Sequence, residues 1–188
     1  MLSEDTIQAT TTASSLKIEL KQPDAADGSA LFQLIERCPP LDPNSRYCNL
    51  LQCSHFAETA VLAWQTDAKG NRRLVGSITA YIPPQQPEVL FVWQVAVAEE
   101  GRGRGLAKSM LFHLLDRPSC QSTRFIETTI TLDNQASWGL FRGVARDLKC
   151  GCEESVYFDQ EQHFGGCHAT EFLCRIGPFS KKEASTNN

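Results

Sequence analysis

The chain has 188 residues, of which 41% are hydrophobic, and this is enough apolar material for one compact core and too little for two. The formal net charge of −4 argues against a nucleic-acid-binding protein, since phosphate contacts require a basic face. No apolar run approaches the roughly 20 residues of a membrane helix. We therefore expect a single-domain protein that binds neither nucleic acid nor membrane.

The two ends of the chain are polar. Residues 1–14 are acidic and lack the basic and apolar parts of a signal peptide. We expect residues 1–14 and 180–188 to be disordered tails around one folded domain at residues 15–179. Without an export signal, the eight cysteines are expected to be reduced thiols in the cytoplasm.

A cluster of cysteines and histidines raises the question of a metal site. Residues 150–168 include Cys150, Cys152, His163, Cys167 and His168. Zinc ligands usually come in pairs separated by two to four residues, and Cys150 and Cys152 are one residue too close for this pattern. No second pair follows, and the other cysteines lie in apolar surroundings. We therefore expect no metal.

In the first half of the chain, residues 15–22 alternate between apolar and polar side chains and predict a strand. Residues 26–38 predict a helix with Asp27 as its N-cap. One face of this helix carries Leu31, Leu34, Ile35 and Cys38. The prolines after it break the chain, and a second helix is expected to begin near Asn44.

Strands are expected at residues 59–66 and 74–84, joined by a hairpin turn at Gly70 and Asn71. Residues 88–99 are rich in β-branched and aromatic residues and predict a central strand buried on both faces. A glycine-rich loop and an amphipathic helix follow, then a strand at 124–131, a helix at 134–148 and strands at 154–158 and 169–177. The predicted fold is mixed α/β (α+β), with helices flanking a mostly antiparallel sheet.

The glycine-rich loop, "GRGRG" at residues 101–105, predicts a phosphate-binding site. It is neither a Walker loop, which requires G-x-x-x-x-G-K-[ST], nor a dinucleotide fingerprint, which would need a small residue in place of Lys108. A strand that ends in glycines and turns into a helix presents main-chain N–H groups to a pyrophosphate. Arg102 and Arg104 can add charge-assisted contacts. The alternative is an ordinary turn.

Two motifs resemble the Gcn5-related N-acetyltransferase family. "RGRGLA" resembles its acetyl-coenzyme A signature, with Arg102, Gly105 and Ala107 at the signature positions, and "NQASWGLF" from Asn134 resembles its second cofactor segment. The resemblance implies the family's fold, with acetyl-CoA as co-substrate. Its implied cofactor-binding residues are Val95, Val97, Arg102, Gly103, Arg104, Gly105, Ala107 and Asn134, with main-chain groups of the two valines on the pantetheine and thioester.

Further stretches resemble the L-2,4-diaminobutyrate acetyltransferases of ectoine synthesis. They are residues 41–47, 91–97, 127–137 and 164–179, and the likeness extends over roughly residues 16–179. It implies transfer of an acetyl group from acetyl-CoA to the 4-amino group of L-2,4-diaminobutyrate, in the synthesis of a compatible solute. A homodimer is expected only because the resemblance to this family implies one.

The implied acceptor carries two ammonium groups and one carboxylate, so its site requires carboxylates and hydrogen-bond donors. We expect Asp42, Tyr47, Trp93, His168 and Glu171 to bind it and Glu127 to act as the general base. Each expectation has an alternative: Asp42 could cap the following helix, Trp93 could lie in the core, and His168 and Glu171 could be ordinary strand residues. Glu127 has the strongest functional indication, because a carboxylate among apolar strand neighbours is costly unless it is paired.

The amine is expected to attack the thioester directly, with the oxyanion near the main-chain N–H of Val97. The family's usual acid for the thiolate is the tyrosine that closes the asparagine segment, and here that position is Phe141. Tyr157 or water could replace it, or the thiolate could leave unassisted. Two other functions stay open: a non-catalytic acetyl-CoA sensor, and an acetyltransferase for another small amine or for protein amines.

Overall fold

The computed structural model describes residues 17–180. The predicted tails, residues 1–14 and all of 180–188 except its first residue, lie outside the described residues, as do the first two residues of the strand predicted at 15–22. No helix within the described range is long and apolar enough to cross a bilayer.

Strands and helices follow one another as the sequence predicts, with a few additions. The strands are β1 (Lys17–Lys21), β2 (Val61–Thr66), β3 (Arg72–Tyr81), β4 (Val89–Val97), β5 (Phe125–Thr131), β6 (Cys152–Phe158) and β7 (Glu171–Ile176). The α-helices are α1 (Gly28–Glu36), α2 (Arg46–Ser54), α3 (Leu106–Leu115), α4 (Gln135–Leu148) and α5 (Gln160–Phe164). Short 3₁₀ turns occupy Ala25–Asp27, Ala57–Thr59, Glu99–Gly101 and Pro118–Cys120.

All seven strands form one sheet in the order β1-β2-β3-β4-β5-β7-β6. Every pair is antiparallel except β4 and β5, which confirms the predicted mixed, mostly antiparallel sheet. The predicted hairpin between β2 and β3 is also confirmed, with Gly70 at a φ of +85° in its turn.

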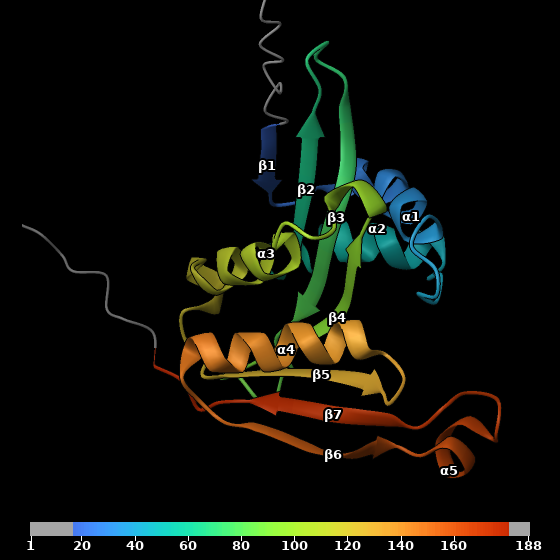
Figure 1. Cartoon of the computed structure of the whole chain (residues 1–188), viewed down its shortest axis with the longest axis vertical. Helices are drawn as coiled ribbons and strands as arrows, with labels where there is room; N and C mark the ends of the chain where they lie inside the picture. The colour runs from blue at the N-terminus through green and yellow to red at the C-terminus, as the bar shows by residue number, and fades with distance from the viewer. Residues whose placement is uncertain (1–16, 181–188) are drawn as a thin grey trace, which may run out of the picture.

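The parallel pair at the centre of the sheet is short. β4 and β5 are in register only where Val89–Phe91 lies beside Phe125–Glu127. Beyond these residues the two strands diverge, and Figure 1 shows β5 running across the molecule while β4 continues toward the glycine-rich loop. The sheet therefore consists of two halves, β1–β4 and β5–β7–β6, joined at one end of their central seam.

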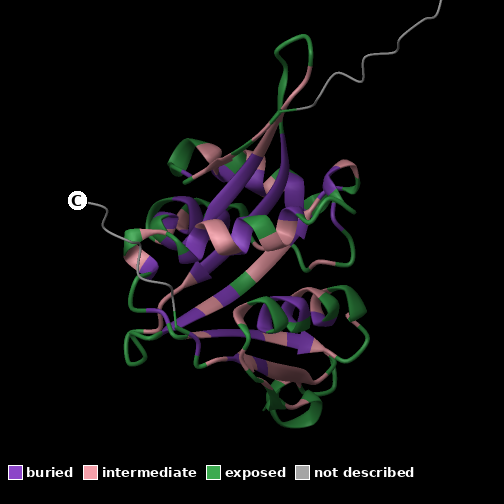
Figure 2. Ribbon diagram, turned by 60° about the vertical axis from the view of Figure 1, so that its left-hand side comes forward, coloured by how far each residue is buried: buried purple, intermediate pink, exposed green. Residues whose placement is uncertain are grey.

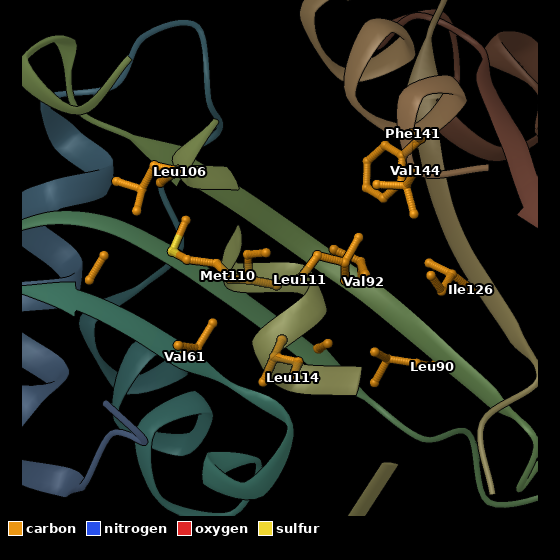
Figure 3. Packing of buried hydrophobic residues seen from close by; sticks show 14 of the residues in the cluster. Val61, Leu90, Val92, Leu106, Met110, Leu111, Leu114, Ile126, Phe141 and Val144 are labelled. Atoms are coloured by element: carbon orange, nitrogen blue, oxygen red, sulfur yellow. The ribbon is translucent and has the colours of Figure 1, made fainter. Parts of the chain in front are cut away.

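One part of the core cluster lies between α3, α4 and one face of this sheet, which we call the core face (Figures 2 and 3). Leu31, Leu34 and Ile35 of α1 belong to the same cluster. Figure 3 shows Phe141 and Val144 of α4 beside Ile126 of β5 and Val92 of β4. Phe141 is only 2% exposed. The position where the family resemblance implies a proton donor is thus filled by an apolar ring inside the core.

The opposite face of the sheet, which we call the second face, is covered by α1 over β2 and β3. Ala30 and Gln33 of α1 line a surface groove together with Trp64 and Leu74, which face each other across these strands. In the half of the sheet formed by β5, β7 and β6, α4 covers the core face and leaves the second face uncovered by that helix (Figure 1).

Two local expectations, and one of the alternatives left open, differ from the structure. Ser45, and not Asp42, caps α2, because the Ser45 hydroxyl accepts the Cys48 N–H at 3.1 Å. Asp27 stands at the N-cap position of α1 but forms no side-chain cap there; its carboxylate instead accepts the Asp24 N–H in a capping box one turn earlier.

The third concerns β4, which is not buried on both faces along its length. Trp93 is 44% exposed, and the register between β3 and β4 shifts at that point, as in a β-bulge. The strand loses its β5 neighbour after Phe91, so its second half has no strand to cover that side.

Candidate active site

The glycine-rich loop has the backbone conformation expected of a phosphate-binding loop. Gly103 and Gly105 have φ angles of +72° and +69°, a region that residues with a Cβ rarely adopt. A Cβ on either glycine would meet no heavy atom within 4 Å, so the space above this backbone is open. No side chain of the described part of the chain caps α3, whose first N–H groups therefore point out of the helix toward this space.

The two arginines of the loop are placed differently. The Arg102 guanidinium turns back, and its Nε donates to the main-chain carbonyl of Val97 at 3.1 Å. Arg104 is exposed at the loop surface, and Ala107 lies half-buried in the first turn of α3. Both arginines are exposed; Arg102 fixes the loop to the end of β4, and Arg104 makes no such contact with the main chain of residues 17–180.

Val95 and Val97 lie on the part of β4 that has diverged from β5. They pair with Ile78 and Gly76 of β3 on one side and have no β5 partner in the register of the central pair. Main-chain groups on this edge of β4 are therefore available to a ligand that lies between the two halves of the sheet.

Asn134 stands at the N-terminus of α4, across the same divergence. Its Oδ1 accepts the Ser137 N–H at 3.1 Å, so the side chain caps the helix. The residue follows the last residue of β5, Thr131, after a two-residue turn. It therefore lies at the end of the sheet that is farthest from the paired segment of β4 and β5.

On the second face, one row of side chains crosses the sheet. The register aligns Tyr81 of β3 with Phe91 of β4, Phe91 with Glu127 of β5, and Glu127 with Arg175 of β7. Aligned residues of neighbouring strands project from the same face of a sheet. The rings of Tyr81 and Phe91 are 5.2 Å apart, as this alignment requires.

Glu127, the predicted general base, is buried and paired. It is 6% exposed, and its Oε1 contacts Nη1 of Arg175. The Arg175 guanidinium also lies 4.0 Å above the Phe125 ring, so it is held by both a charge and an aromatic face. Burial raises the pKa of Tyr81, and the nearby Tyr157 and Glu127 side chains raise it further.

Three of the predicted acceptor residues come together at the other end of the second face. His168 Nε2 lies 3.6 Å from the Asp42 carboxylate and 3.9 Å from that of Glu171. Burial raises the pKa of Glu171, while a hydrogen bond from Thr129 and the nearby His168 oppose the shift. Oε2 of Glu171 is buried without a hydrogen-bond partner among the described residues. An unsatisfied carboxylate oxygen of this kind suits a cationic ligand.

The loop that carries Asp42 is attached to β4 by one side chain. Gln94 donates through Nε2 to the Asp42 carbonyl and accepts from Asn44 Nδ2, both at 3.1 Å. Because Gln94 follows Trp93 on the diverged part of β4, its hydrogen bonds connect the loop that carries Asp42 to the strand that carries Val95 and Val97.

The remaining two predicted acceptor residues are exposed. Trp93 is 44% exposed and contacts Tyr81 edge-on at 6.3 Å, so the alternative that it belongs to the core is wrong. Tyr47, in the first turn of α2, is 69% exposed, and its side chain makes no hydrogen bond or ring contact with another described residue. The structure does not bring Tyr47 into contact with the other five.

Sequence reasoning missed Arg175 and Tyr81. Arg175 could have been found from the alternation of β7, in which Glu171, Leu173 and Arg175 share a face, together with the need of a buried Glu127 for a cation. Tyr81 gave no signal of its own at the end of an apolar strand. Among residues 17–180, no three His, Cys, Asp or Glu side chains are grouped so as to hold a metal ion.

Comparison with known proteins shows the family of the chain. Residues 29–144 match the acetyltransferase (GNAT) family. The L-2,4-diaminobutyric acid acetyltransferase of Methylotuvimicrobium alcaliphilum is 52% identical over 167 residues, covering 89% of this chain and 94% of that protein. The enzyme of the same name from Bordetella parapertussis is 45% identical, covering 89% and 88%.

A solved structure is similar over the same range. The diaminobutyrate acetyltransferase EctA from Paenibacillus lautus, in complex with L-2,4-diaminobutyric acid and coenzyme A, superposes with a TM-score of 0.81 at 38% identity. The match covers 89% of this chain and 99% of that one. The NatC complex bound to a Gag peptide and CoA matches with a TM-score of 0.68 at 17% identity, which shows a shared fold alone.

Proposed function

Because this chain belongs to the L-2,4-diaminobutyric acid acetyltransferases, within the GNAT family, we propose that it transfers the acetyl group of acetyl-CoA to the 4-amino group of L-2,4-diaminobutyrate. The product is N4-acetyl-L-2,4-diaminobutyrate, in the synthesis of ectoine. The observation that carries the proposal is the second face itself, where Glu127 and the group formed by Asp42, His168 and Glu171 flank one surface beside the diverged end of β4.

The coenzyme half of the site uses mainly main-chain groups. The N–H groups around Gly103 and Gly105 and at the start of α3 bind the pyrophosphate, with Arg104 adding positive charge. The pantetheine arm runs along the β4 edge at Val95 and Val97, near Asn134. This accounts for how few side chains mark a coenzyme A site in the sequence.

The acceptor half holds a small dication with one carboxylate. Asp42 and Glu171 bind the 2-ammonium group, and His168 between them donates to the substrate carboxylate. Trp93 supplies an aromatic wall, and Tyr47 closes the entrance from α2. Glu127 contacts the 4-amino group and helps to remove its proton, directly or through water.

Transfer is direct, from thioester to amine. A covalent route through a cysteine is disfavoured, because burial raises the pKa of Cys48 and raises that of Cys53 to about 12. Neither thiol supplies a thiolate at neutral pH. The amine lone pair attacks the thioester carbonyl, and the oxyanion is stabilised by the main-chain N–H near Val97.

The departing thiolate receives its proton from a group other than residue 141. Phe141 has no proton to donate and is buried in the core. Tyr157 of β6, which is 45% exposed, is one candidate for this donor. Water is the alternative donor, and a thiolate of modest basicity can also leave unassisted.

Two other functions have less support. A non-catalytic acetyl-CoA sensor would not need Asp42, His168 and Glu171 to meet on the second face. An acetyltransferase for protein amines shares the fold, but the unsatisfied carboxylate oxygen of Glu171 and the paired, buried Glu127 suit a small charged diamine better than a peptide.

A steady-state assay with acetyl-CoA and a panel of amines tests the proposal. We expect L-2,4-diaminobutyrate to give the highest kcat/KM, and lysine to be a poor acceptor, because its longer chain moves the carboxylate away from its donors. Preference for lysine or for a peptide would contradict the assigned substrate and leave the acetyl-CoA assignment intact.

We also propose a homodimer in the cytoplasm. β6 is an edge strand whose Val156, Tyr157 and Phe158 are 58%, 45% and 39% exposed, which supports burial against a second copy. The free thiols of the eight cysteines are consistent with a reducing compartment. Light scattering after size exclusion tests the dimer: a monomer at micromolar concentration would contradict it.

A further inference from the structure

We infer that Arg175 controls the charge state of the reacting amine: by neutralising Glu127, it makes the reacting end of the site favour a neutral amine over an ammonium ion. The inference rests on the proposed function, which places the 4-amino group beside Glu127. Arg175 is then a positioning residue, because it acts on the substrate through the carboxylate that it contacts.

The contact between the two side chains is built into the sheet. Glu127 and Arg175 face each other directly in the register of β5 and β7, and their side chains are 7% and 32% exposed. The Phe125 ring lies 4.0 Å from the guanidinium and restricts it from the other side. Arg175 is the single cationic partner of Glu127 among residues 17–180.

The other groups around the pair contribute no compensating cation. Glu153 of β6 stands directly across from Arg175, but it is exposed and forms no ion pair with it in the described structure. Tyr81 of β3 and Tyr157 of β6 have phenol side chains, which carry no positive charge in either protonation state. Phe91 of β4 is apolar. The local charge is thus set by one carboxylate and one guanidinium.

The opposite end of the second face has a different balance. There Asp42 and Glu171 share one His168, so two carboxylates face one imidazole. The cluster is net negative when the imidazole is neutral, and a protonated imidazole offsets only one of the two negative charges. Asp133 adds a further negative charge near Glu171. This end stabilises an ammonium ion, and the Glu127–Arg175 end does not.

This difference in charge between the two ends of the second face gives the two amino groups of one substrate different protonation states. The 2-amino group binds as an ammonium ion at the carboxylate cluster. At the other end the N–H bond of the 4-ammonium breaks with its electron pair left on nitrogen, and the proton passes through Glu127 to water. The lone pair then forms the bond to the thioester carbon, the carbon–sulfur bond breaks with its electron pair left on sulfur, and the nitrogen loses a second proton to give the neutral amide while the thiolate takes up one proton from water or a neighbouring donor. Without Arg175 the carboxylate would hold the ammonium form instead.

The first experiment measures the pH dependence of kcat with diaminobutyrate. In Arg175→Met the acidic limb should move to higher pH by about one unit or more, a tenfold change in the protonation equilibrium. Glu127→Gln leaves the guanidinium unbalanced and should move the limb to lower pH. Arg175→Lys, which keeps the charge, and the double variant E127Q/R175M, which removes both charges, should leave the limb near its wild-type position.

A matched control removes another arginine–glutamate pair from the same half of the sheet. Arg142 of α4 contacts Glu154 of β6 at 2.8 Å, with side chains 50% and 39% exposed. Arg142→Met should leave the limb unchanged. Arg175→Met leaves a buried carboxylate unpaired and could unfold the protein; in that case Glu127→Gln and the double variant decide the matter. A limb that stays in place in Glu127→Gln contradicts the inference.

The second experiment needs no turnover. Calorimetric titration of diaminobutyrate into the protein with coenzyme A, in buffers of different ionisation enthalpy, counts the protons released on binding. The wild type should release close to one proton at pH 7.5, and Arg175→Met fewer. Equal release contradicts the inference alone, whereas a wild type that does not bind diaminobutyrate contradicts the proposed function and the inference together.

Discussion

Asp42 and His168 come from opposite ends of the described chain, yet the Asp42 carboxylate lies 3.6 Å from the imidazole of His168. The contact joins the loop before α2 to the start of β7 across the second face. Glu171 completes the cluster at 3.9 Å. No local sequence pattern links these residues, so their meeting is a property of the folded sheet and supports a shared role in binding one small molecule.

Glu171→Gln should raise the KM for diaminobutyrate at least tenfold, because it removes a buried charge that faces the 2-ammonium group. Burial raises the pKa of Glu171, so its carboxylate is protonated at a higher pH than that of a solvated glutamate. The wild-type KM should rise as the pH falls through the range in which Glu171 is protonated, whereas the KM of the Gln variant should stay constant over that range.

Stability provides an independent check on Glu171. A carboxyl whose folded-state pKa is raised costs stability when it ionises, so the wild type should lose stability relative to Glu171→Gln as the pH rises through the same window. Urea unfolding at several pH values measures this difference. A difference that is constant with pH would contradict the burial of an ionising group at this position.

Gly105→Val should weaken acetyl-CoA binding at least tenfold, or about 1.4 kcal/mol. The added side chain enters the open space above the loop and must also adopt a φ of +69°. Gly70→Val is the matched control, since Gly70 has a φ of +85° in the distant β2–β3 hairpin. Calorimetry on both variants should show the loss in the first alone; unchanged affinity in a folded Gly105→Val protein would contradict the assignment of the loop.

Glu127→Gln should reduce kcat with diaminobutyrate by roughly a hundredfold or more, within the range for loss of a general base. Acetyl-CoA affinity should stay near the wild-type value, because Glu127 lies on the second face and not along the coenzyme edge of β4. Glu154→Gln removes a carboxylate from the exposed pair with Arg142 and serves as the control. Turnover near normal in Glu127→Gln would contradict its role.

Phe141→Tyr should not raise turnover, and it should lower the free energy of unfolding by about 1–3 kcal/mol, the cost of a buried hydroxyl without a partner. Phe141 is 2% exposed between α4 and the sheet. A hundredfold rise in kcat for Phe141→Tyr would show that protonation of the thiolate limits the natural enzyme.

The parts of the structure that depend on local patterns could be predicted from the sequence. The turn at residues 101–105, the helix after it and the Gly70 hairpin follow from residue types at short spacing, and these three local structures are confirmed. The binding of pyrophosphate by the glycine-rich loop stays a prediction. Glu127 stood out because a carboxylate in an apolar strand needs a partner, and the structure supplies one.

The parts that depend on strand register could not. Arg175 reads as one more strand residue until β7 is placed beside β5, and Trp93 reads as core until β4 is seen to diverge from its neighbour. Ser45 and Asp42 are both residue types that cap helices, and only the observed start of α2 at Arg46 identifies Ser45 as its N-cap. Long-range pairing, and not residue preference, decided each of these cases.

The three-residue seam between β4 and β5 has a consequence for the lifetime of the protein. Two half-sheets, with α3 over one and α4 over the other, share little direct hydrogen bonding at the centre. A coenzyme that lies along the β4 edge would bridge them as a strand does and would stabilise only the folded chain, by RT ln(1 + [L]/Kd). Resistance to unfolding and proteolysis would then rise and fall with the supply of acetyl-CoA, so the metabolic state of the cell would help to set how much of this enzyme persists.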